Sequence, residues 1–209
     1  MLKQLIVVDD FLSDPAAARA AALSLEYPVR DVGSNYPGRN SVQRIDIPDL
    51  ESVVSEIIGH RVVGSTYGGH RKCRLALEKD DGTNLGGVHI DSAAHWSCIL
   101  FLTLPEHCQG GTRFFKHKRL GTDRAPLSQS ELRQQGFDNP LAVHSDLLLH
   151  DSNDETKWEE LMTVPMRFNR LILFRPWLWH TAGISFGDRP ENGRLVYLLF
   201  FDEVQMRKR

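Results

Sequence analysis

At 209 residues with 41% hydrophobic content, the chain is long enough to bury one sizeable core and short for two ordinary domains, so we expect a single domain spanning residues 1–209. A formal net charge of −2 gives no overall field that would gather nucleic acid or an acidic membrane surface, and neither partner is expected. Cys73, Cys98 and Cys108 are an odd number at irregular spacings, which fits reduced structural thiols and neither a disulfide framework nor a zinc ribbon.

The N-terminal part of the chain predicts a strand, a turn and a helix. The apolar run at residues 5–8 precedes two aspartates and is far too short for a signal peptide or a membrane span, so a cytoplasmic location is expected. Ser13 is the expected N-cap of an alanine-rich helix with Pro15 in its first turn. Residues 28–50 have the glycine, proline, asparagine and serine content of a loop, and a second helical pattern follows at 49–60.

Short branched and aromatic runs dominate from about residue 62 onward, which predicts strands joined mostly by segments too short for a crossover helix and therefore antiparallel. These runs lie at residues 61–67, 73–79, 95–104, 112–117, 169–180 and 193–203. Residues 116–168 differ: this polar insertion has helical patterns at 128–136 and 154–162 and is typical of a lid or binding loop. The whole predicts an α+β, mainly β, fold with N-terminal helices packed on one sheet of a β-sandwich or open barrel.

Two potential metal ligands lie close together in the stretch GGVHIDSAAHW, residues 86–96. Side chains two apart on a strand point to the same face, so His89 and Asp91 can reach one ion from Cα atoms about 7 Å apart. An imidazole and a carboxylate suit a divalent first-row metal, and two histidines with one carboxylate leave coordination positions open. His180 is the best third ligand because it ends an apolar run, where a metal would satisfy its polar group.

Arg194 is the second notable group. It leads directly into seven consecutive apolar residues, 195–201. If that strand is buried on both faces, the guanidinium either extends from the strand end or needs an anion to offset its desolvation. A carboxylate that accepts two hydrogen bonds from the guanidinium is the strongest such partner, so we expect an anion site near the metal site.

The order of these residues resembles the iron(II)- and 2-oxoglutarate-dependent oxygenases, in particular the small prolyl-hydroxylase-like branch. The resemblance is carried by His89-Ile90-Asp91, the run at 95–104, the turn GGTRFF at 110–115, His180 and Arg194, together with the N-terminal VVDDFLSDPAAARAAAL at 7–23. It covers most of the chain apart from residues 116–168. Each part alone is a weak motif, whereas the ordered combination is specific.

The resemblance implies a double-stranded β-helix, a jelly-roll or cupin-like barrel, with Fe(II) held at its mouth by His89, Asp91 and His180. It implies that 2-oxoglutarate chelates the iron and extends its far carboxylate to Arg194. Dioxygen then converts 2-oxoglutarate to succinate and CO₂ while an unactivated C–H bond of the substrate is hydroxylated. The carboxylate ligand Asp91 favours hydroxylation, because family members that halogenate have Gly or Ala there.

One position departs from a common variant of the family. In that variant a serine two residues after the arginine also binds 2-oxoglutarate, and here Val196 occupies the position. A hydroxyl for the same carboxylate must come from elsewhere, and Ser97, Thr103 and Tyr197 all remain candidates.

A second His-x-Asp match competes with the first. His144 and Asp146, with His150 nearby, lie in the polar insertion. We favour His89 because it is followed by a predicted strand, the glycine turn and a further strand, whereas His144 lacks that context.

Aromatic and cationic residues near the predicted mouth are candidate substrate contacts. They are His95, Trp96, Arg113, Arg175 and Trp179, with Trp177 beside them. An aromatic wall with cationic groups would suit an acidic substrate. The alternative is that the tryptophans fill the core, as tryptophan commonly does.

The sequence therefore predicts an Fe(II)/2-oxoglutarate oxygenase acting on a small molecule or an amino-acid-type substrate. One alternative is a peptidyl or prolyl hydroxylase in which the insertion cradles a peptide. Another is a cupin-like metal-binding domain without oxygenase activity, in which Arg194 is structural. The residues carry no signal for oligomeric state.

Overall fold

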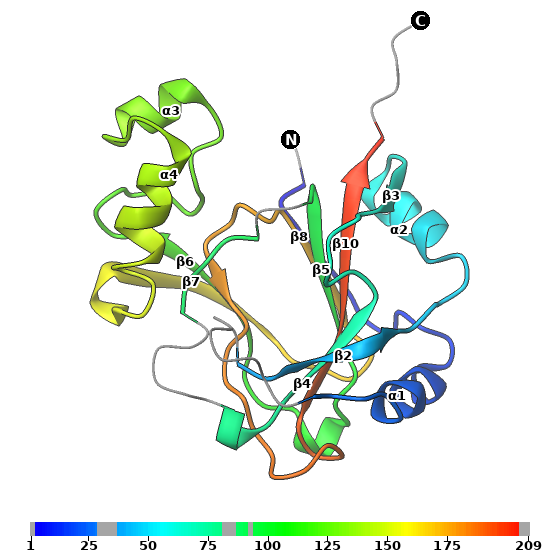
Figure 1. Cartoon of the computed structure of the whole chain (residues 1–209). Helices are drawn as coiled ribbons and strands as arrows, with labels where there is room; N and C mark the ends of the chain where they lie inside the picture. Colours follow the sequence, from blue (N-terminus) through cyan, green and yellow to red (C-terminus); the bar gives the residue numbers. More distant parts are fainter. Residues whose placement is uncertain (1–2, 29–36, 81–86, 92–93, 205–209) are drawn as a thin grey trace, which may run out of the picture.

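The computed structural model of the chain describes residues 3–28, 37–80, 87–91 and 94–204. Two antiparallel sheets form its centre (Figure 1). The larger sheet has the order β1 (Leu5–Val8), β8 (Leu171–Phe174), β5 (Trp96–Phe101), β10 (Arg194–Glu203), β4 (Lys72–Ala76), β2 (Arg39–Arg44), and β3 (Val62–Gly64) also pairs with β10. The smaller sheet has the order β7 (Trp158–Pro165), β6 (Gly111–His117), β9 (His180–Thr181).

Two helices cover the outer face of the larger sheet, as the sequence predicts. Helix α1 (Pro15–Leu23) and helix α2 (Leu50–Ile58) bury Ala22, Leu50, Val54 and Ile58 against that sheet. The predicted N-cap of α1 is wrong by one residue. Asp14, rather than Ser13, accepts the backbone N–H of Ala17 at 2.9 Å and so satisfies a donor that the first helical turn leaves unpaired.

The space between the two sheets is filled by alternate residues of the central strands. On β10, Val196, Leu198 and Phe200 face the smaller sheet, whereas Tyr197 and Leu199 face the helices. Because side chains alternate along a strand, every second residue of β10 belongs to the inner face. The same face receives Phe114 from β6, so the inner core is continuous across both sheets.

The insertion packs on the outer face of the smaller sheet. Its helices α3 (Gln129–Gln134) and α4 (Pro140–Val143), followed by a π-helical turn at His144–Leu148, lie beside β6 and β7 in Figure 1. Leu132, Val143 and Leu147 are buried there against Trp158 and Trp179. The molecule therefore has four layers: N-terminal helices, larger sheet, smaller sheet and insertion. In the described part of the chain, short 3-10 helices also lie at Glu78–Asp80, Pro105–His107 and Glu155–Lys157.

The predicted helix at residues 154–162 is wrong. Most of this segment belongs to β7, which pairs with β6 along its whole length, so only residues 118–157 lie between the two strands. Opposite charges meet across the pair, with Arg113 bound to Glu160 and Lys116 to Glu159. These cross-strand pairs and the ladder hydrogen bonds outweigh the local helical pattern.

Two other segments differ from their prediction. The expected loop at 28–50 contains β2, which pairs with β4. The single strand expected at 169–180 is two strands in different sheets, β8 and β9. Pro176 lies between them, and a proline there cannot donate a ladder hydrogen bond, so the chain leaves one sheet and enters the other.

All strand pairings between the described elements are antiparallel, which confirms that prediction. The α+β, mainly β, class with N-terminal helices on one sheet is also confirmed. Among the described residues, no helix is both long and apolar enough to cross a membrane.

Candidate metal centre

His89, Asp91 and His180 come together at one end of the space between the sheets. The backbone of His89 forms an isolated antiparallel bridge with His180, with N–H to carbonyl distances of 2.9 Å and 3.0 Å in the two directions. The N–H of Asp91 donates to the carbonyl of Pro176 at 2.9 Å. These backbone hydrogen bonds hold the segment with His89 and Asp91 against the segment that carries His180.

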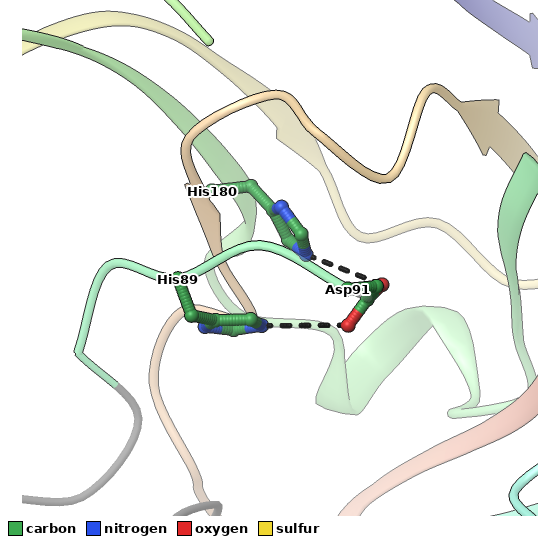
Figure 2. A group of neighbouring side chains, drawn as sticks. All are labelled: His89, Asp91 and His180. Carbon is green, nitrogen blue, oxygen red and sulfur yellow. Dashed lines mark ion pairs between the residues drawn. The ribbon is translucent and has the colours of Figure 1, made fainter. Parts of the chain in front are cut away.

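The three side chains point toward one another (Figure 2). One carboxylate oxygen of Asp91 lies 3.9 Å from Nε2 of His89, and the other lies 3.5 Å from Nε2 of His180. The three candidate ligand atoms all lie within 4.8 Å of one another. Within the described part of the chain, this is the one group of three or more His, Cys, Asp or Glu side chains close enough to hold a metal ion.

The chemistry of the donors fits a metal. Nδ1 of His89 lies 2.9 Å from the carbonyl of Gly87, and Nδ1 of His180 lies 2.8 Å from the carbonyl of Leu178. Since a carbonyl can only accept, each Nδ1 carries a proton, and in the neutral form of each ring the lone pair is then on Nε2. A metal-binding histidine is typically held in this way by a hydrogen bond from its other ring nitrogen.

The electrostatics keep the ligands in their metal-binding forms. Burial, together with His180, lowers the pKa of His89 to about 4, so its imidazole is neutral at neutral pH. Burial alone would raise the pKa of Asp91, but the neighbouring His180 and His89 hold it well below its usual range. Asp91 is therefore a carboxylate.

Aromatic rings fix the position of His180. The ring of Phe174, on the larger sheet, meets it edge-on with centroids 4.6 Å apart, and the ring of Phe114, beside His180 on the smaller sheet, has its centroid 6.2 Å away. His180 is 3% exposed. The apolar packing restricts its rotamers, so the geometry of the centre does not depend on solvent-exposed side chains.

The insertion clamps the segment that carries His89. The carbonyl of Ser152 accepts the N–H of Val88 at 2.9 Å, and the Ser152 hydroxyl donates to the Val88 carbonyl at 2.9 Å. A Cβ on Gly87 would collide with the side-chain oxygens of Ser152 and Asn153, so this close approach requires glycine. The insertion thus supports the metal centre from outside.

A polar pair between β6 and the insertion holds the clamp in place. His117 is fully buried on β6, and its Nε2 lies 2.9 Å from a carboxylate oxygen of Asp151. The indole N–H of Trp158 donates to the carbonyl of Asp151 at 2.7 Å. Residues 151–153 are therefore fixed to both strands that flank the insertion.

A cavity of about 110 Å³ opens beside the three residues and contains Arg194 in its lining. Arg194 is 3% exposed and begins β10, whose first eight residues are all buried. It shares the inner face of that strand with Leu198 and Phe200, which line the same cavity. The structure thus brings Arg194 and the three candidate ligands together.

The lining also includes Asn40 on β2 and Arg74 on β4, which the sequence did not predict as site residues. Nε of Arg74 donates to the side-chain oxygen of Asn40 at 2.8 Å, and its positive charge acts on His89. Arg74 lies between Cys73 and Leu75, both buried against the helices, and this alternation was the available signal for an inward-facing arginine.

The three hydroxyl candidates have different positions. Ser97, on the inner face of β5, lines the cavity. The Tyr197 hydroxyl donates to the carbonyl of Ile45 at 2.7 Å on the helix side of the sheet. The Thr103 hydroxyl donates to the carbonyl of Gly193 and accepts the N–H of Leu195. Of the three, the structure brings only Ser97 to the cavity.

Among the described residues, the cavity lining includes none of the five predicted substrate contacts. Trp96 is buried on the helix side of β5, and Trp179 is buried among the insertion residues. Arg113 binds Glu160 on the outer face of the smaller sheet. In both sheets, strand alternation places these side chains on the face opposite to the cavity.

Arg175 and His95 belong to a separate cluster at the C-terminal end of β10. The guanidinium of Arg175 stacks 4.0 Å over Trp96 and lies 5.3 Å from Trp177, and it binds Glu203 at 2.6 Å. His95 pairs with Asp202 at 3.0 Å.

The competing His-x-Asp motif, His144 and Asp146, lies in the π-helical turn of the insertion.

Solved structures of similar fold and one matching protein family were found by comparison with known proteins. The non-heme alpha-ketoglutarate-dependent carbocyclase SnoK from nogalamycin biosynthesis matches with a TM-score of 0.52 and 14% identity over 96% of this chain and 80% of its own. A Pseudomonas putida prolyl-4-hydroxylase matches with a TM-score of 0.44 and 13% identity, over 97% of this chain and 94% of its own. HygX from Streptomyces hygroscopicus, with nickel, 2-oxoglutarate and hygromycin B bound, matches with a TM-score of 0.46 and 11% identity, over 97% of this chain and 84% of its own.

The likeness to SnoK confirms the predicted double-stranded β-helix, the jelly-roll fold of the 2-oxoglutarate-dependent oxygenases. No curated protein matches the sequence. A model described as a family of unknown function, DUF6445, matches residues 2–201. The chain therefore belongs to the DUF6445 family and has the oxygenase fold.

Proposed function

We propose that the protein is an Fe(II)- and 2-oxoglutarate-dependent oxygenase. The observation that carries the proposal is the convergence of two imidazole Nε2 atoms and one carboxylate within 4.8 Å, beside a cavity that a buried arginine also lines. Two histidines and one carboxylate are the ligand set of non-heme iron(II) oxygenases, and they leave coordination positions open. A guanidinium in the same cavity suits a dicarboxylate cosubstrate.

Each residue has a defined task in this proposal. His89, Asp91 and His180 hold Fe(II), and the carbonyls of Gly87 and Leu178 keep the two imidazoles in the ligating tautomer. Arg194 binds the far carboxylate of 2-oxoglutarate. When bound, iron with 2-oxoglutarate and dioxygen supplies the oxidising power to hydroxylate an unactivated C–H bond, and succinate and CO₂ are released.

The carboxylate ligand narrows the reaction. Asp91 faces both histidines and is ionised, so it occupies the position that a halide takes in halogenating members of the oxygenase superfamily. Hydroxylation or a related oxidation is therefore favoured. We propose a small molecule or an amino-acid-type compound as the substrate, since the cavity is small and closely lined.

Anaerobic titration with Fe(II) and 2-oxoglutarate tests the proposal. The wild-type protein is expected to develop the weak visible charge-transfer band of 2-oxoglutarate chelated to ferrous iron. Absence of the band, with the metal verified as bound, would contradict the proposal.

Arg194→Ala separates this function from a metal-binding barrel without oxygenase activity. We expect the variant to bind Fe(II) normally and to lose 2-oxoglutarate affinity by about 10- to 100-fold, because a hydrogen-bonded charge pair is removed. In a barrel where Arg194 is structural, 2-oxoglutarate would bind neither protein, and the variant would differ from wild type in stability alone.

A further inference from the structure

A second cavity, of about 360 Å³, lies away from the three candidate metal ligands. Its lining includes residues of β1 and of β7, which end the larger and the smaller sheet in the described strand order. The second cavity therefore lies where the two sheets part. Of the described residues, none lines both this cavity and the one beside His89, Asp91 and His180, so the proposed oxygenase function does not use it.

The lining of the second cavity is mostly apolar. Its apolar members are Leu5, Phe114, Phe115, Leu161, Met162 and Leu178. Its polar members are Gln4 and Asp123. A cavity of this size, with an apolar wall and few polar groups, is typical of a site for a small molecule. Two phenylalanine rings and a methionine sulfur favour an aromatic body in that molecule.

A β-bulge directs two consecutive side chains of β7 to the second cavity. The register of β6 and β7 shifts after Phe114, so Leu161 is an extra residue with no direct partner on β6. Consecutive residues of a regular strand face opposite sides, whereas Leu161 and Met162 both line the cavity. These two side chains are 49% and 48% exposed, and a bound molecule would remove their apolar surface from water.

Two residues of the lining also hold His180. The ring centroid of Phe114 lies 6.2 Å from that of His180, and the carbonyl of Leu178 accepts the Nδ1–H of His180 at 2.8 Å. The arrangement of Phe114 and Leu178 that forms the cavity wall is thus the arrangement that orients His180. A ligand that binds this arrangement favours metal binding, and the metal favours the ligand in return.

We propose that the second cavity binds a compact molecule with an aromatic body, and that this binding strengthens the binding of Fe(II) by His89, Asp91 and His180. Occupancy of the cavity is independent of the oxygenase function. Its effect on iron rests on the metal centre proposed above.

Methionine methyl NMR of the metal-free protein tests the cavity, with indole as the probe. The chain has four methionines, and the resonance of Met162 is identified by its loss in Met162→Leu. Indole is expected to shift this resonance saturably, with a Kd of about 1 mM or tighter. Glycerol at the same concentration is the polar control and should leave the resonance unchanged.

Leu161→Asp locates the binding site. A carboxylate on the cavity wall keeps water there, so the affinity for indole should fall at least about tenfold, as measured on the same Met162 resonance. Leu127→Asp is the matched control, because Leu127 is 52% exposed and lines neither cavity. This control should bind indole as wild type does.

Anaerobic titration with Fe(II), with and without saturating indole, tests the effect on the metal centre. Wild type is expected to bind Fe(II) about fivefold more tightly with indole present, and saturating Fe(II) should tighten indole binding by the same factor. Leu161→Asp should show no such increase at the same indole concentration.

Three results would overturn the site: no shift of the Met162 resonance, equal affinity for indole in Leu161→Asp and wild type, or a dimer in sedimentation that Leu161→Asp converts to a monomer. The last would make the cavity an interface between copies of the chain. If indole binds and the affinity for Fe(II) is unchanged, the effect on the metal centre fails. Failure of the oxygenase function is seen separately, as absence of the charge-transfer band.

Discussion

At the scale of single residues, the position of a residue on its strand decides whether its side chain reaches the cavity. Ser97 and Tyr197 were equal candidates for a hydroxyl near 2-oxoglutarate. Ser97 lines the cavity from the inner face of β5, whereas the Tyr197 hydroxyl bonds to Ile45 on the helix side. A shift of one residue along a strand moves a side chain to the other face of the sheet, and this parity separates the two candidates.

Tyr197→Phe should therefore affect stability and not ligand binding. Loss of its hydrogen bond to Ile45 is expected to lower the free energy of unfolding by about 1 kcal/mol, as a denaturant titration would measure. Its 2-oxoglutarate affinity should equal that of wild type. Ser97→Ala is the paired variant: because Ser97 lines the cavity together with Arg194, we expect it to weaken 2-oxoglutarate binding about tenfold, as measured by the charge-transfer band. The parity argument fails if Tyr197→Phe is the variant that loses ligand affinity.

At the scale of elements, the insertion supports the metal centre through the clamp at residues 151–153. Its helices pack on the outer face of the smaller sheet, and none of its described residues lines the cavity beside the metal centre. The expectation of a lid came from length and polarity alone. The contacts with Gly87 and Val88 instead place the insertion behind the segment that carries His89.

Ser152→Ala tests the clamp. Removal of the hydroxyl that donates to the Val88 carbonyl should loosen the segment and weaken iron binding about tenfold, with little change in 2-oxoglutarate affinity at saturating iron. Metal titration of the anaerobic protein measures the change, and Ser152→Thr should restore most of it. Ser145→Ala is the control, since Ser145 makes a comparable bond to Ala142 in the same insertion. Equal metal affinity in all four proteins would contradict the clamp.

At the scale of the whole molecule, three histidines in separate parts of the fold share one property. Burial is the largest cause that lowers the pKa of His70, of His117 and of His89, the last to about 4. The unfolded chain binds more protons than the folded one below a pH of about 6.5, so stability falls as the pH falls toward the folded pKa values.

The metal-free protein should accordingly become less stable between pH 7 and pH 5. His89 alone is expected to contribute a loss of about 2 kcal/mol by pH 5, and the Tm should fall by several degrees. Thermal unfolding in the presence of a chelator measures this change. His89→Gln should show a shallower dependence, because glutamine does not titrate. A Tm that is constant over this range would contradict the burial of neutral histidines.

The sequence by itself determined the fold class, the N-terminal helices and the identity of the candidate ligands. These features are local: the apolar periodicity of α2, the branched runs of β5 and β10, and the spacing of His89 and Asp91 can all be read within a few residues. Ordered motifs then predicted His180 and Arg194, and the structure brings both to the same cavity.

Only the tertiary structure decided what depends on contacts between distant segments. It made residues 158–165 a strand, because β6 supplies partners for their backbone and charges, and it turned Arg113, Trp96 and Trp179 away from the cavity. It also brought Arg74 and Asn40 to His89 across three separate segments. Which face of a strand lies inside the barrel depends on strand register and sheet order, and these follow from pairing that no single stretch of sequence contains.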